Sequence, residues 1–103
     1  GMNGGNIVLT SGSTLDVKNG AYGIMTGKGV AGITVENGAT INVDGKANIA
    51  GATEKNVSFG IAAYSGNIEN KGTINVTNGA TGIYVAGTSK LINQGTITIG
   101  TGG

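Results

Sequence analysis

Apolar and polar residues alternate in short segments of this chain, and the segments recur at a regular spacing. The segment from Asn70 to Val76 matches the segment from Asn93 to Ile99 position for position, 23 residues later. In both segments polar and aliphatic residues alternate, and this period of two residues is typical of a half-buried strand. Looser copies lie upstream, at 35–43 and 9–17. A fixed period in the twenties indicates an array of similar coils, each too small to bury its own apolar face.

A second phrase recurs half a repeat after the first. The segments 17–24 and 76–83 share the pattern V-x-N-G-A-x-G-I. In the middle copy the distance from Val43 to Ile61 is 18 residues, against seven in the regular copies. The sequence therefore predicts an insertion of about eleven residues within 44–58.

Each coil is predicted to contain three short strands separated by glycine-containing corners. The predicted strands are 7–9, 33–35, 68–70 and 91–93 for the first position, 15–17, 41–43, 74–76 and 97–99 for the second, and 24–26, 61–63 and 83–85 for the third. Equivalent residues of successive coils should stack at about 4.8 Å. The inward file of the second strand would be Leu15, Ile41, Ile74 and Ile97, and the outward file Asp16, Asn42, Asn75 and Thr98.

We therefore predict an all-β fold, a right-handed parallel β-helix of about four coils of 22–25 residues with the insertion near 44–58. The Asn-Gly pairs at 19–20, 37–38 and 78–79 also suit β-hairpins. A small antiparallel sandwich or barrel is the alternative, although it leaves the 23-residue match unexplained. The 22 glycines are typical of disordered chains as well, but the aliphatic residues recur in register. Residues 1–103 are expected to be one solenoid fragment of a longer array, with 1–5 derived from a tag or disordered.

Composition removes several kinds of chemistry. The net charge is only +1 and the chain has no Arg, so a nucleic-acid partner is not predicted. Without Cys or His, neither a Ser-His-Asp nor a Cys-His arrangement is available. The five acidic residues are scattered through the coils, and no calcium-binding nonapeptide repeat occurs. We predict a protein that is not an enzyme and has no catalytic, cofactor-binding or metal-binding residues.

Two rows of polar residues follow the repeat. Asn70 and Asn93 align, with Asn37 close to the same row, and this favours an internal ladder of stacked amides over a row that binds a ligand. A threonine occurs once per coil, which also suits ice binding, although a single Thr per coil is more typical of an ordinary β-surface. That file is Thr14, Thr40, Thr73 and Thr96.

Candidate contacts with a ligand come from the few aromatic residues and from the insertion. Tyr84 follows the inward Ile83 and should point outward, and Tyr22 is placed at the corner before Ile24. Aromatic side chains are common anchors in recognition, although plain surface decoration explains them equally well. Loops that project from a rigid scaffold also often carry specificity. Within the insertion the candidates are Lys46, Glu54 and Lys55.

The repeat resembles those in passenger domains of large Gram-negative autotransporter adhesins of type V secretion. The matching residues are Ile68, Asn70, Gly72, Thr73, Ile74 and Val76, then Asn78, Gly79, Ala80, Gly82, Ile83, Tyr84 and Val85. The resemblance implies an extracellular location on the cell surface, with the parent protein anchored in the outer membrane through a separate barrel. It implies an adhesive or stalk function, with a host-cell or bacterial surface protein or a glycan as partner.

Two other functions share the predicted architecture, a phage tail-fibre or tailspike segment and a fragment of a carbohydrate-active β-helix. The exposed terminal coils lead to one further expectation. Open strand edges and a half-exposed core at both ends should make the fragment stack end to end with itself.

Overall fold

The computed structural model describes residues 5–27, 31–45 and 58–100, and all of their regular structure is β-strand. Within this part no helix is long and apolar enough to cross a membrane. The eleven strands are β1 (Asn6–Leu9), β2 (Thr14–Val17), β3 (Tyr22–Thr26), β4 (Gly32–Val35), β5 (Thr40–Asp44), β6 (Phe59–Ala63), β7 (Asn67–Asn70), β8 (Thr73–Thr77), β9 (Thr81–Val85), β10 (Lys90–Asn93) and β11 (Thr96–Ile99).

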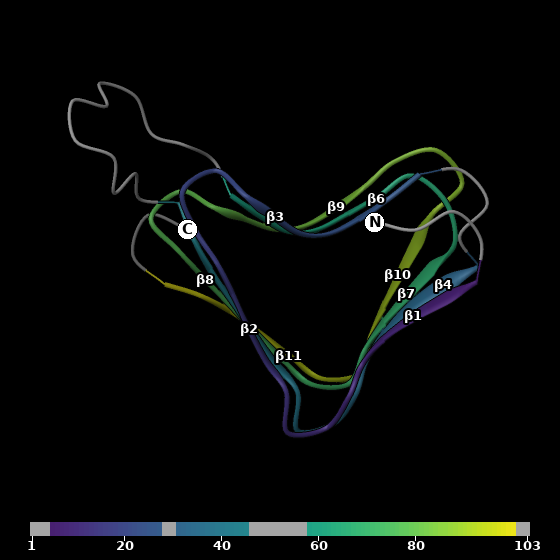
Figure 1. The fold of residues 1–103 in the computed structure, drawn as a ribbon, viewed down its shortest axis with the longest axis horizontal. Coiled ribbons are helices and arrows are strands. Elements are labelled where there is room, and N and C mark those ends of the chain that lie inside the picture. Colours follow the sequence, from purple (N-terminus) through teal and green to yellow (C-terminus); the bar gives the residue numbers. More distant parts are fainter. Residues whose placement is uncertain (1–4, 28–30, 46–57, 101–103) are drawn as a thin grey trace.

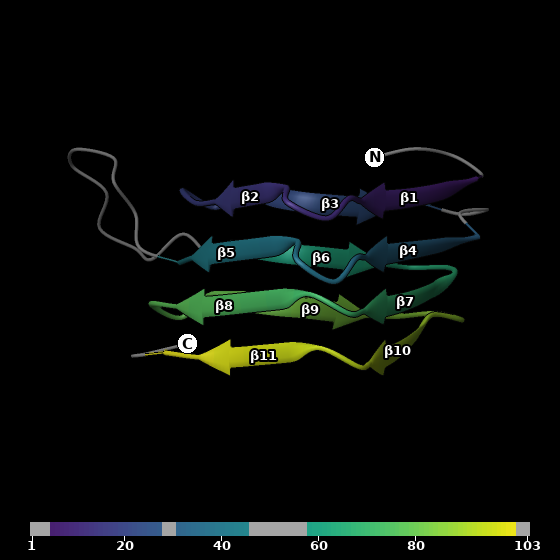
Figure 2. The ribbon, with the colours of Figure 1, turned by 90° about the horizontal axis from the view of Figure 1, so that it is seen from below.

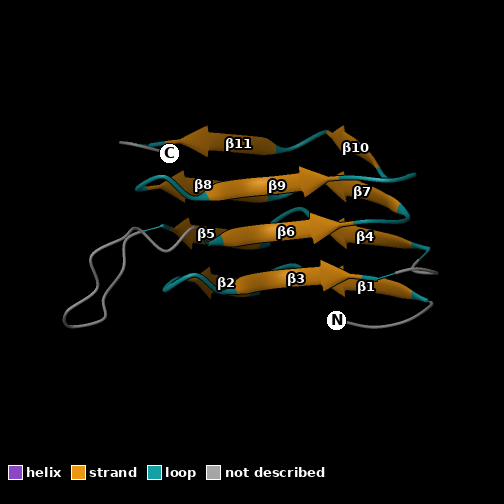
Figure 3. Cartoon of the chain, turned by 90° about the horizontal axis from the view of Figure 1, so that it is seen from above, coloured by secondary structure: helices purple, strands orange, loops and turns teal. Residues whose placement is uncertain are grey.

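The strands form three parallel sheets, each built from equivalent strands of successive coils. Their orders are β1-β4-β7-β10, β11-β8-β5-β2 and β3-β6-β9. Figure 1 looks along the stack and shows the three sheets around a common interior. Figures 2 and 3 show the coils from the side, as successive levels. Every strand pairs with the strand one coil away, so the all-β, three-strand prediction is confirmed and the antiparallel alternative is wrong.

The register between coils is the one that the repeat predicts. Ile41 pairs with Leu15 on one side and with Ile74 on the other, and Ile74 pairs with Ile97. Ile41 and Ile74 are fully buried, while the two end members are half-buried because each has a neighbour on one side only. The outward file is aligned in the same way, from Asp16 to Thr98.

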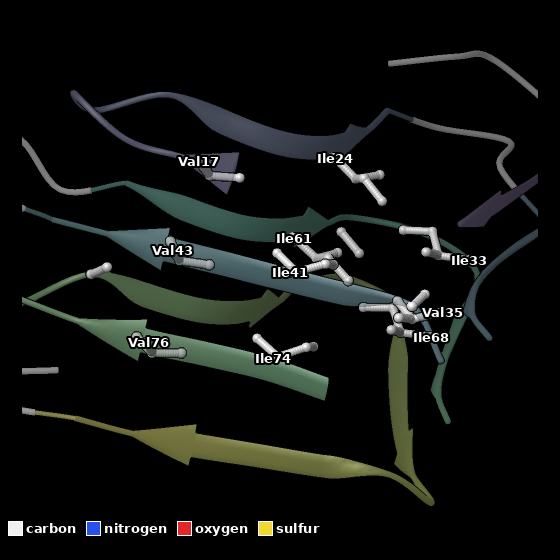
Figure 4. Packing of buried hydrophobic residues seen from close by; sticks show 13 residues of the cluster. Val17, Ile24, Ile33, Val35, Ile41, Val43, Ile61, Ile68, Ile74 and Val76 are labelled. Carbon is white, nitrogen blue, oxygen red and sulfur yellow. The ribbon is translucent and has the colours of Figure 1, made fainter. Parts of the chain in front are cut away.

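The core is a set of aliphatic files contributed by all three sheets. Figure 4 shows Ile41 of β5, Ile61 of β6 and Ile68 of β7 pointing into the same interior. Stacking aliphatic residues of similar size gives successive coils a similar cross-section, so that equivalent side chains pack against one another. The buried hydrophobic cluster is Val17, Ile24, Ile33, Val35, Ala39, Ile41, Val43, Ile61, Ala63, Ile68, Ile74, Val76 and Ala80.

A file of glycines lets the third sheet approach the second. A Cβ atom added at Gly60 would lie 2.8 Å from Cγ2 of Val43 and 2.6 Å from the carbonyl oxygen of Gly82. At Gly82 it would lie 2.8 Å from Cγ2 of Val76. Gly23 stands in the same relation to a valine one strand earlier. These contacts explain the second glycine of V-x-N-G-A-x-G-I, and Figure 1 shows β3, β6 and β9 bending toward the interior.

The Asn-Gly pairs form corners between the faces of a single coil. Asn19 and Asn78 have φ values of 57° and 53°, and each is followed by a glycine with positive φ. The N–H groups of Ala21 and Ala80 donate to the carbonyl oxygens of Lys18 and Thr77, which closes each turn. Two successive positive φ values are the geometry of a tight hairpin turn. Here the same turn leads into the next face of the coil, so the hairpin interpretation is wrong.

The predicted insertion falls between two well-defined strands. β5 ends at Asp44 and β6 begins at Phe59. Lys46, Glu54 and Lys55, predicted as ligand contacts, lie outside the described residues, as do residues 1–4 of the predicted tag segment.

Candidate functional site

Every aromatic side chain of the chain lies in one cluster on the outer face of the third sheet. The rings of Tyr22 and Phe59 are stacked, with centroids 4.8 Å apart and planes 7° from parallel. Tyr84 meets Phe59 and Tyr64 edge to face, at 6.1 Å in both cases. We call these four residues the aromatic patch. Since the sequence contains three Tyr, one Phe and no Trp, the rest of the molecule has no aromatic surface at all.

The strand register brings the four rings together. Tyr22 pairs with Phe59 between β3 and β6, and Tyr84 lies beside Ala62 between β9 and β6. Tyr64 directly follows β6, and its N–H donates to Oγ1 of the buried Thr26 at 3.2 Å. This bond fixes the point at which the chain leaves the sheet, and so fixes the root of the Tyr64 side chain.

The patch is exposed and carries no charge. Tyr22, Tyr64 and Tyr84 are 46%, 42% and 44% exposed, and Met25 beside them is 43% exposed. No Asp, Glu or Lys occurs in β3, β6 or β9. The other two sheets both contain charged residues, such as Asp16, Glu69 and Lys90. The third sheet thus presents a neutral surface of rings and phenol hydroxyls.

The outer face of the second sheet carries a different surface, a row of amides and carboxylates. Nδ2 of Asn42 donates to Oδ1 of Asp16, and Nδ2 of Asn75 donates to Oδ1 of Asn42, each at 2.9 Å. Beside this row is an open depression of about 390 Å³, which is lined by Asp16, Val17, Lys18, Asn42, Val43, Asp44, Asn75 and Thr77. No group of three potential metal ligands occurs among the described residues. The amides of this row bond to one another, which favours a structural role for them.

The predicted hydrogen bond between the aligned Asn70 and Asn93 is present, and of the two residues Asn70 is internal while Asn93 is exposed. Asn70 is fully buried, and its Nδ2 donates to Oδ1 of Asn93 at 2.9 Å. Its Oδ1 accepts the backbone N–H of Gly72 at 3.2 Å. Asn37, predicted to lie close to this row, is not part of it, because Val35 is the residue that pairs with Asn70. Asn37 is exposed, in a turn closed by the N–H of Ala39 and the carbonyl of Glu36.

The threonine file is aligned as predicted, from Thr14 through Thr40 and Thr73 to Thr96. Each coil contributes one Thr at this position. The idea that this file binds ice stays a prediction.

Of the predicted ligand contacts, the structure brings two into one place. Tyr22 and Tyr84 both touch Phe59, and Tyr84 is outward as predicted. Tyr22 is the first residue of β3 and not a corner residue. Phe59 and Tyr64 were missed as site residues. Phe59 had a sequence signal, since it precedes the Gly-Ile of its coil as Tyr22 does in the coil before, but the insertion separates it from the rest of its phrase.

Comparison of the chain with protein-family models, with curated proteins and with solved structures finds no match. The resemblance to autotransporter passenger repeats therefore stays a hypothesis that rests on the residues of the repeat. Any function must be argued from the coil architecture and from the surfaces that it carries.

Proposed function

We propose that this chain is a non-enzymatic segment of a surface-exposed bacterial autotransporter passenger, and that it supports or mediates adhesion as part of a right-handed parallel β-helix. The observation that carries the proposal is the coil-to-coil register. Three sheets of equivalent strands repeat the sequence phrase that resembles passenger repeats, and most of the shared positions, the exposed Tyr84 excepted, are core and corner residues.

The right-handed coil is supported by chain geometry. A strand that returns to a parallel neighbour through a crossover does so with a right-handed turn in nearly all known cases. Each coil of this chain makes such a crossover, because its three strands belong to three sheets and the fourth strand returns to the first. Where no insertion intervenes, equivalent strands recur after 22 to 26 residues, slightly more than the predicted upper limit of 25 in the first coil, and this spacing with three unequal faces suits the same architecture.

A stalk or adhesin function is supported by the structural roles that most side chains of the chain have. Its aliphatic residues fill the interior, and its asparagines satisfy one another or the corners. Such a scaffold extends by adding coils and holds any surface feature at a fixed place. A protein that presents a binding surface at a distance from the cell requires these two properties.

Immunolabelling tests the proposed location. Antibodies raised against the 103-residue chain are applied to intact cells of the organism that encodes it, and to permeabilised cells as a control. We expect labelling of intact cells that external protease treatment removes. Labelling confined to permeabilised cells would contradict the proposal, and labelling of released virions would favour the phage-fibre alternative.

A further inference from the structure

The aromatic patch has no structural task that requires so much exposed ring surface. The interior of the third sheet is already filled by Ile24, Ile61 and Ile83, which face the core. Tyrosine is costly to leave on a surface, since its ring is apolar and only its hydroxyl is well solvated. Yet the three tyrosines of the chain are each more than two-fifths exposed and lie together.

The size of the patch favours a small ligand. An aromatic side chain offers on the order of 200 Å², so three half-exposed tyrosines provide roughly 300 Å² of ring surface. A standard protein interface takes about 800 Å² from each partner. The patch therefore falls well short of a protein-binding surface, while it matches a ligand of a few rings.

The chemistry of the patch favours a neutral, hydroxylated ligand. Ring faces carry negative potential and attract polarised C–H groups, and the phenol hydroxyls both donate and accept hydrogen bonds. A pyranose offers C–H groups on its faces and hydroxyls at its edge. Because β3, β6 and β9 contain no charged residue, nothing on this sheet would recognise a carboxylate or sulfate.

We propose that the aromatic patch is a binding site for a neutral saccharide, with Tyr22, Tyr64 and Tyr84 as the contact residues. This deepens the proposed adhesive function and rests on it for its biological meaning. The saccharide stacks on the exposed rings and hydrogen-bonds to the phenol hydroxyls. Phe59 lies between Tyr22 and Tyr84 and holds their rings in place.

The test uses the purified 103-residue chain and an array of neutral and anionic oligosaccharides. The strongest neutral binder is then titrated by calorimetry. We expect Tyr84→Ala to weaken its binding about tenfold or more, as for other aromatic contacts. Tyr84→Phe, which keeps the ring, should lose less. Val8→Ala is the matched control, because Val8 is equally exposed but lies on the first sheet, and it should leave the affinity unchanged.

Two results would overturn this inference. One is the absence of any neutral binder on the array, and the other is undiminished binding by the triple variant Tyr22→Ala, Tyr64→Ala and Tyr84→Ala. Circular dichroism of each variant separates lost binding from lost folding. If no saccharide bound and a purified surface protein bound to the patch instead, the patch would be reassigned to protein recognition. The binding assay does not depend on the cell-surface labelling experiment. One proposal can therefore fail while the other stands.

Discussion

Asn70 shows how one side chain can connect two coils and a corner. It is fully buried, gives a hydrogen bond to Asn93 in the next coil and receives one from the Gly72 N–H in its own. A buried amide is tolerated only because its donor and its acceptor are both engaged. Its role is therefore one of closing the corner, and no ligand is needed to explain it.

Replacing Asn70 by Ala should destabilise the protein by about 2–3 kcal/mol, because the buried N–H of Gly72 loses its acceptor. Asn93→Ala is the control, since Asn93 is exposed and water can replace it, and we expect a loss of about 1 kcal/mol or less. Urea unfolding followed by circular dichroism measures both. Equal losses would show that the buried acceptor is not what matters.

The inward and outward positions of β8 give a second prediction. Ile74→Asp would place an unpaired charge between Ile41 and Ile97 and should cost more than about 4 kcal/mol. Asn75→Asp, one residue along, loses one exposed-side amide bond to Asn42 and should cost about 1 kcal/mol. If Ile74→Asp does not fold, Ile74→Ala provides a measurable loss of about 2–5 kcal/mol. Similar melting temperatures for the variants at 74 and 75 would contradict the assigned faces.

Single residues were predictable from sequence wherever the repeat was intact. The strands, the inward aliphatic file and the Asn70–Asn93 pair all follow from a match at 23 residues. Asn37 was misplaced because its copy of the phrase is looser, and its own Asn-Gly turn sets it two positions beyond Val35. A polar residue near a row is not in the row unless its strand register places it there.

Among the elements, the third sheet depends on its glycines. At Gly82 an added methyl group would meet only side chains, namely Cγ2 of Val76 at 2.8 Å and Cγ2 of Ile74 at 3.7 Å. Gly82→Ala should therefore cost about 1–3 kcal/mol through overpacking. Val76→Ala removes the obstructing methyl groups, so the double variant should be more stable than the sum of the single losses predicts, by about 0.5 kcal/mol or more.

The control for this cycle is Val35→Ala, which empties a similar volume on the first sheet. Combined with Gly82→Ala it should give additive losses. The same unfolding experiments measure the Val76 cycle. Additive losses there as well would mean that the valine side chains are not the reason why glycine is required at these positions.

The aromatic patch could not be predicted as an element of the fold. Tyr22 and Phe59 are 37 positions apart in the sequence, and the insertion hides their equivalence. Tyr64 lies after its strand, where the repeat makes no assignment. The patch is a product of register between coils, which becomes visible only when the strands are paired.

At the scale of the whole molecule, the open strand edges favour association between copies. Ile99 is 57% exposed in the edge strand β11, and Leu91 and Ile92 are exposed in β10. We expect the 103-residue chain to associate increasingly as its concentration rises to millimolar, measured by sedimentation velocity. A strictly monomeric profile over that range would rule this out.

The backbone of β11 offers a variant that blocks this edge. The N–H groups of Thr96 and Gly100 bond back to the carbonyls of Gly72 and Val76. Alternate N–H groups of a strand point in opposite directions, so that of Ile99 faces the open edge. Ile99→Pro should therefore reduce association with little effect on the melting temperature, whereas Ile99→Val should leave association unchanged.

The hydrogen bonds that join successive coils run along the stacking axis, because each strand is bonded to the equivalent strand of the next level, and Figure 3 shows these levels one above another. A force applied between the two ends would load these bonds in tension and separate the coils one after another. Each released coil of 23 residues would lengthen the chain by about 80 Å. A molecule held in this way would yield in many small steps under shear, and the coils still stacked would keep their surfaces intact while it stretched.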